Sequence, residues 1–171
     1  MAGIQVSLTP LTWLGPFIYF GLRLLQYALR PGLDPAAAVG EAFSFTFAVE
    51  VGIVVHAAGH ILGGLLVRSP MDELLFTATR GINLYSGDQA RYPGRVHLGR
   101  ALGGPLLNLL WAALLFAGLP HIRAGFLSEL AASLAATSLF IGAGSFLPLP
   151  SVDGWVIWRE VLRGLWPRGR A

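Results

Sequence analysis

Residues 45–67 read FTFAVEVGIVVHAAGHILGGLLV and contain one carboxylate, Glu50, and two histidines, His56 and His60. A mostly apolar stretch of about 20 residues is long enough to cross a bilayer as a helix. Residues four apart share one face of a helix, so both imidazoles should project from the same side. Polar side chains inside a bilayer are costly and usually functional. This stretch therefore predicts a membrane-spanning helix that carries part of a binding site.

The composition of the 171-residue chain agrees with a membrane protein. Hydrophobic residues make up 54% of the chain and charged residues 12%, whereas soluble domains have about a quarter charged residues. The length suits one domain, and we expect residues 1–171 to form a single membrane domain. The absence of cysteine excludes disulfides, thiolate metal sites and thiol nucleophiles. The cations are dispersed arginines beside apolar stretches, which favours membrane topology over nucleic-acid binding.

The apolar stretches predict an all-α integral membrane fold with about four transmembrane helices. The expected spans are residues 11–29, 36–67, 101–119 and 125–147. Residues 68–100 are polar and are expected as a loop, within which residues 74–85 alternate loosely and predict a short hairpin or an irregular segment. Pro148 and Pro150 should end the fourth span, because proline removes a backbone donor. Residues 152–166 mix tryptophans with charged residues and predict a C-terminal interfacial helix.

The arginines predict how the chain is oriented. With four spans, both termini and the 68–100 loop share one side of the membrane. That side holds most of the arginines, namely Arg68, Arg80, Arg91, Arg95, Arg100, Arg159, Arg163, Arg168 and Arg170. The other side holds Arg30 and Arg123. The positive-inside rule then places both termini in the cytoplasm, in a prokaryotic-type inner membrane. We expect the partners to be the membrane and other integral membrane proteins, with the 68–100 loop as the first surface to examine, and no nucleic acid.

His56 and His60 have the spacing of two imidazoles that hold one metal ion from a helix. The alternative is two core histidines that make hydrogen bonds, and periodicity alone does not separate these readings. Asp153 follows the helix break at Pro148 and Pro150 and offers a carboxylate as a third ligand. By itself an aspartate after such a break is more often a helix cap or a turn residue. Its pairing with the two histidines favours a metal site.

Three short motifs together resemble the signatures of the site-2 protease family, which are intramembrane zinc metalloproteases. They are HAAGH at residues 56–60, GPLLN at residues 104–108 and LPLPSVDG at residues 147–154. They occur in the family's order on three expected membrane segments, and the resemblance covers roughly residues 45–158. It implies a site-2-protease-like core with His56, His60 and Asp153 as zinc ligands, leaving a fourth position for water as catalytic zinc sites do.

Two positions depart from the family's pattern. In the family a glutamate follows the first histidine and moves a proton from the attacking water to the leaving amine. Here that residue is Ala57, and a methyl group can do neither, so no catalytic residue is intact. Ser145 stands where the family usually has an asparagine that helps to hold the substrate. Asn108 could hydrogen-bond a substrate or merely another helix. Asn108 and Ser145 are the expected substrate-binding residues. Three acids, Glu41, Glu50 and Glu160, are poorly placed to substitute.

These observations favour a proteolytically inactive homologue that acts as a binding or assembly subunit of a membrane complex and keeps a zinc site. The alternative is an active intramembrane zinc metalloprotease in which the catalytic glutamate was deliberately changed to alanine. A third reading is a metal-independent scaffold, in which the histidines are core residues or ligate something else, such as the central metal of a pigment. Metal content separates the third reading from the first two.

Overall fold

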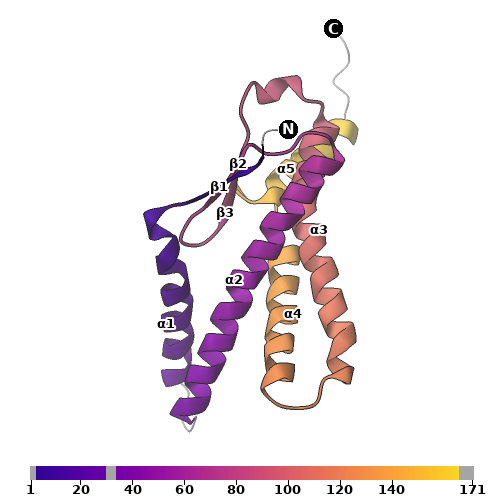
Figure 1. The fold of residues 1–171 in the computed structure, drawn as a ribbon. Coiled ribbons are helices and arrows are strands. Elements are labelled where there is room, and N and C mark those ends of the chain that lie inside the picture. Colours follow the sequence, from indigo (N-terminus) through magenta and orange to yellow (C-terminus); the bar gives the residue numbers. More distant parts are fainter. Residues whose placement is uncertain (1–2, 30–33, 166–171) are drawn as a thin grey trace.

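The computed structural model describes residues 3–29 and 34–165, and Figure 1 shows its helices gathered around a long oblique helix. Arg30, Trp166, Arg168 and Arg170, which entered the sequence predictions, lie outside the described residues. The described elements, in chain order, are β1 (Gln5–Leu8), η1 (Pro10–Trp13), α1 (Leu14–Ala28), α2 (Pro35–Leu66), β2 (Glu73–Phe76), β3 (Gly81–Leu84), η2 (Gln89–Arg91), α3 (Gly94–Gly118), η3 (Leu119–His121), α4 (Phe126–Gly144) and α5 (Asp153–Leu165).

Three described segments are long and apolar enough to cross a membrane: Pro35–Leu66, Gly94–His121 and Phe126–Gly144. These are the expected second, third and fourth spans, so the chain is a mostly helical membrane protein. The expected first span is helix α1, which has 15 residues and is therefore only about 22 Å long. It runs beside α2 (Figure 1).

Helix α2 is the long helix against which α1, α3 and α4 pack. Pro35 occupies its first turn, and the side chain of Asp34 accepts a hydrogen bond from the backbone nitrogen of Ala37 at 3.2 Å. These are favoured residues for a helix start. Proline lacks a backbone N–H, which would have no partner in the first turn, and the aspartate accepts from a free N–H. The 32 residues of α2 correspond to about 48 Å, which exceeds the roughly 30 Å of bilayer hydrocarbon. The helix accordingly crosses the bundle obliquely (Figure 1).

Glycines bring α2 and α3 into close contact. A β-carbon on Gly59 would clash with the backbone of Gly103, and one on Gly103 would clash with the backbone of Gly59. Gly63 packs against α3 in the same way. Small residues are the usual means by which membrane helices approach closely, because lipid provides no hydrophobic drive to association. This contact sets α3 directly behind the two histidines of α2.

Helix α3 begins at Gly94, seven residues before the expected start at residue 101. Charged residues such as Arg95 and Arg100 made this segment resemble a loop. Arg100 is nevertheless only 6% exposed. Its guanidinium donates to the carbonyl and the hydroxyl of Ser69, and it lies over the ring of Tyr85 at 4.0 Å. Because this arginine is hydrogen-bonded and stacked, the helix can extend beyond the apolar segment.

A small sheet lies at one end of the bundle. Strands β2 and β3 pair antiparallel, which confirms a hairpin within residues 74–85 as one of the two expected forms. Strand β1 pairs parallel to β2 and gives the order β1-β2-β3. This third strand was not foreseen, because its partner is distant in sequence. We call this the sheet end of the molecule, and the opposite end, with the loop between α3 and α4, the distal end (Figure 1).

Helix α4 ends at Gly144, three residues before the expected residue 147. Residues 145–152 form turns, and α5 begins at Asp153. Glu160 of α5 is buried at 9% exposure rather than lying at an exposed interface. It pairs with Arg159 and Arg163 and also lies against Gly94, the first residue of α3. A carboxylate at a helix N-terminus is favourable, so this contact fixes α5 against α3.

Candidate metal centre

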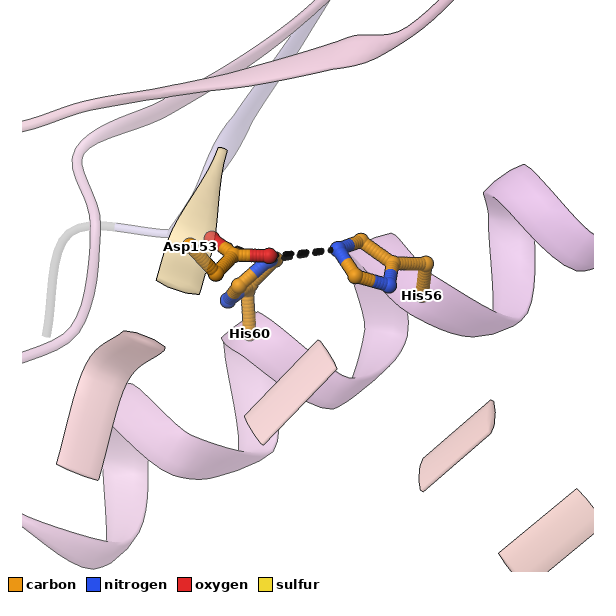
Figure 2. A group of neighbouring side chains, drawn as sticks. All are labelled: His56, His60 and Asp153. Carbon is orange, nitrogen blue, oxygen red and sulfur yellow. Dashed lines mark hydrogen bonds and ion pairs between the residues drawn. The ribbon is translucent and has the colours of Figure 1, made fainter. Parts of the chain in front are cut away.

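His56 and His60 of α2 meet Asp153, the first residue of α5, at the sheet end of the bundle (Figure 2). Nε2 of His56 lies 2.9 Å from Oδ2 of Asp153, and Nε2 of His60 lies 3.3 Å from Oδ1. The two Nε2 atoms are 3.0 Å apart. Three ligand atoms of the types that zinc prefers thus converge on one point.

The spacing of these atoms fits a small tetrahedral ion. Zinc bonds of about 2.0–2.1 Å in a tetrahedron hold neighbouring ligand atoms about 3.3 Å apart. The two Nε2 atoms, 3.0 Å apart, and the pair formed by Nε2 of His56 and Oδ2 of Asp153, 2.9 Å apart, need to separate by only a few tenths of an ångström. Nε2 of His60 lies 3.3 Å from the other carboxylate oxygen, Oδ1. The side chain of His60 is 5% exposed, while those of His56 and Asp153 are 19% and 22% exposed. The centre is therefore sheltered but open on one side.

His60 is held ready to bind a metal. Its Nδ1 donates to the backbone carbonyl of Arg100 at 2.8 Å. A carbonyl can only accept, so Nδ1 carries the proton and the lone pair of neutral His60 lies on Nε2, toward Asp153. Metal-ligating histidines are commonly oriented in this way by a backbone carbonyl.

Asn108 plays the matching part behind His56. It is fully buried on α3, and its amide nitrogen lies 3.3 Å from Nδ1 of His56. With Nδ1 as the acceptor, Nε2 of His56 carries the proton and donates to Asp153. A metal at Nε2 requires that proton to move to Nδ1. Oδ1 of Asn108 is buried without a partner and would accept from Nδ1 after a half-turn of the amide. The residues therefore fit a bound metal.

Gly104 leaves room for both imidazoles. A β-carbon there would lie 2.6 Å from Nε2 of His60 and 2.7 Å from Nε2 of His56. Any larger residue at this position would displace the ligand atoms themselves. The sequence showed this glycine only as the first residue of the GPLLN motif, because its contact with the histidines depends on how α3 crosses α2.

Asp153 is placed by several contacts around the turn before α5. The indole of Trp158 donates to the carbonyl of Phe146 at 2.8 Å, and Arg80 of the hairpin donates to the carbonyl of Ser151 at 3.2 Å. Gly154 lies directly against the backbone of Phe146, where a side chain would clash. These contacts bring a carboxylate to histidines that lie 97 and 93 residues away in sequence.

Asp153 is anionic at neutral pH. Burial would raise the pKa of its carboxyl group, but the interactions with His56 and His60 outweigh burial and lower the pKa to about 2. The carboxylate is therefore ionised over the whole physiological range, as a metal ligand must be.

Ala57 and Ser145 line the same cavity as the ligands. Ala57 is 5% exposed and packs in a hydrophobic cluster with Met71 and Leu74. The hydroxyl of Ser145 donates to the carbonyl of Ile141 at 2.8 Å. Asn108, the other expected substrate-binding residue, contacts His56 and has no exposed surface. Glu160 is already paired with Arg159 and Arg163.

A solved structure is similar to the whole described arrangement. The site-2 protease from Methanocaldococcus jannaschii matches with a TM-score of 0.68 over 97% of this chain and 70% of that chain, at 17% sequence identity. The chain has the site-2 protease fold. At this identity the similarity establishes the fold and nothing finer. No protein-family model matches the sequence, and no curated protein matches it.

Within the site-2 protease fold, the sequence motifs are brought to one place. The histidine pair lies on α2, the GPLLN motif on α3 and Asp153 at the start of α5. Contacts that sequence reasoning missed are the Arg100 carbonyl, the room left by Gly104 and the hairpin contact through Arg80. Only the glycine carried a sequence signal, as a small residue within a motif.

Proposed function

We propose that this chain is a non-hydrolytic relative of the site-2 proteases that binds zinc through His56, His60 and Asp153. The observation that carries the proposal is the methyl group of Ala57 beside a three-ligand cluster that is otherwise complete. When bound, zinc supplies Lewis acidity that polarises a carbonyl group or acidifies water. This chain has no side chain at residue 57 to accept a proton or return it to a leaving group.

The surroundings of Ala57 support a natural alanine. Met71 and Leu74, which are 2% and 3% exposed, pack with it in one apolar cluster. A methyl group suits such a niche, whereas a carboxylate in apolar surroundings is costly without a partner. We therefore favour a natural non-protease over a protease altered by a deliberate substitution.

We further propose that the chain serves as a binding or assembly subunit among other integral membrane proteins, with its termini on the cytoplasmic side of an inner membrane. The support is indirect: a binding fold is retained while the general base is absent. The polar segment that includes the hairpin and the exposed residues 86–88 lies at the proposed cytoplasmic end. It is the first surface to test for contact with a partner.

Metal content and cleavage test the enzymatic half of this proposal. Purified protein should hold about one zinc ion per chain by mass spectrometry, and His60→Ala should lower zinc affinity by well over the 10- to 100-fold typical of an outer-shell loss. A membrane-spanning peptide should not be cleaved. Unchanged zinc in His60→Ala would contradict the ligand assignment. Zinc-dependent cleavage by the wild-type chain, or its appearance in Ala57→Glu, would instead support the protease reading.

Extraction in mild detergent tests the assembly half. The protein should migrate at fixed stoichiometry with other membrane proteins after extraction from the membrane in which it is naturally made. A lone chain or a homo-oligomer under conditions that preserve other complexes would contradict an assembly role, while leaving the zinc assignment unaffected.

A further inference from the structure

One cavity of about 1790 Å³ extends from the metal centre to the distal end of the bundle. At the sheet end it is lined by His56, His60 and Asp153, and at the distal end by Ala37 and Phe126. From Ala37 to His60 the helix rises about 35 Å, which is as much as the hydrocarbon core of a bilayer. The cavity thus follows α2 through most of the thickness of the membrane.

Ionisable side chains gather at the distal part of this cavity. Arg23 comes from α1, Glu41 from α2 and Glu129 from α4, so three helices each contribute one charge. Among the described residues, neither glutamate forms an ion pair. Arg23 donates from Nη1 to Gln26 at 2.6 Å, and its guanidinium lies over the rings of Tyr27 and Phe45 at 4.9 and 5.1 Å. Its Nε is buried without a hydrogen-bond partner.

These ionisable side chains indicate what fills the distal part of the cavity. Ionisable groups within a membrane protein face the bundle interior or a water-filled cavity, because lipid chains cannot solvate them. Glu41 and Glu129 are exposed and form no ion pair among the described residues, and Nε of Arg23 has no hydrogen-bond partner, so water at this end of the cavity would solvate all three groups. Serine and threonine side chains continue the polar lining toward the metal centre, at Ser44, Ser133 and Thr137.

We propose that the distal half of the cavity is an aqueous vestibule, open to the side of the membrane opposite the sheet, that admits water and small water-soluble solutes toward His56. The inference does not depend on whether the centre hydrolyses peptides. It gives the metal centre an access route along α2 from the distal side.

Cysteine accessibility tests the vestibule directly, because the chain contains no cysteine. Ser133→Cys and Ala136→Cys place thiols on the cavity wall, in the middle of α4. Leu139→Cys is the matched control: it lies on the same helix, is 44% exposed and is not part of the cavity lining. Ala124→Cys and Ala90→Cys, both at exposed positions, mark the distal and sheet ends. Each variant is expressed in the full chain and treated in sealed vesicles with a charged, membrane-impermeant methanethiosulfonate.

Thiols react with this reagent as thiolates, which form only in contact with water. Ser133→Cys and Ala136→Cys should therefore react from the side on which Ala124→Cys reacts, and at least about ten times faster than Leu139→Cys. Rates as slow as that of Leu139→Cys would mean that lipid chains or a partner helix fill the distal half of the cavity, and would overturn the proposal. Reaction only from the side of Ala90→Cys would also overturn it. Ser133→Cys is almost isosteric with serine, so it decides the matter if Ala136→Cys fails to fold.

Discussion

At the residue scale, the two histidines differ in how they are prepared for a metal. The carbonyl of Arg100 fixes the proton of His60 on Nδ1, so Nε2 is available. His56 is held by an amide that can face it with either end. An amide that rotates lets one residue support both the metal-free and the metal-bound histidine, because its nitrogen donates and its oxygen accepts.

Asn108→Leu should therefore weaken zinc binding, since it removes the acceptor for the Nδ1 proton of His56. Loss of such a supporting hydrogen bond typically costs about 10- to 100-fold in metal affinity. Competition with a chelator of known affinity measures the change. Asn108→Asp keeps an oxygen at this place and should lose less. Equal affinity in Asn108→Leu and wild type would show that Asn108 only packs the helices.

At the element scale, helix crossings position the ligands. α3 lies close enough to α2 for Gly104 to touch both imidazoles. α5 carries Asp153 at its first residue and is held two turns later by Glu160 against the start of α3. The metal centre therefore depends on how three helices meet, and changes at either contact should reach the ligands.

Gly104→Ala should lower zinc content, because the added methyl group would occupy space within 2.7 Å of both Nε2 atoms. Gly118→Ala on the same helix is the control, since no atom lies within 4 Å of a β-carbon there. Both proteins are purified and their zinc is measured by mass spectrometry. Full zinc occupancy in Gly104→Ala would show that the close fit at this glycine is not needed.

Glu160→Ala should loosen α5. The side chain of Glu160 is only 5% exposed, and its carboxylate forms ion pairs with Arg159 and Arg163. Hydrogen bonds to charged groups contribute about 1.5–3 kcal/mol, so we expect a lower unfolding temperature in detergent and reduced zinc content. Arg91→Ala removes an exposed pair with Asp88 and should change stability by about 1 kcal/mol or less. Equal unfolding temperatures for the two variants would contradict a role for Glu160 in holding α5.

At the scale of the whole molecule, the sheet fixes the path of the N-terminal region. β1 pairs with β2, which follows the C-terminal end of α2. Helix α1 must then run from the sheet end back to the start of α2, alongside that helix (Figure 1). The short α1 therefore traverses the bundle in the direction expected of a first span.

This topology predicts that both ends of the chain lie on the same side of the membrane. Reporter tags fused at the N- and C-termini should be accessible from one side only, and a tag in the loop around Ala124 should be accessible from the other. The positive-inside rule predicts that the termini lie on the cytoplasmic side. Termini found on opposite sides would mean that α1 does not cross.

The sequence by itself determined the membrane class, the order of the long helices and the three residues that meet at the candidate metal centre. It could do so because apolar length and four-residue spacing are local properties of a chain. The site-2 protease fold predicted from three motifs is confirmed by the structural similarity. The sequence also identified Ala57 as the residue in place of the family's glutamate, because it directly follows His56.

Only the tertiary structure decided how these parts meet. The parallel strand β1, the early start of α3 and the burial of Glu160 all depend on partners distant in sequence, which no local pattern encodes. The same holds for the Arg100 carbonyl, for the fit of Gly104 and for the cavity that joins Arg23, Glu41 and Glu129 to the metal centre. The four-residue spacing indicates the histidine pair, whereas helix packing sets the distances among His56, His60 and Asp153.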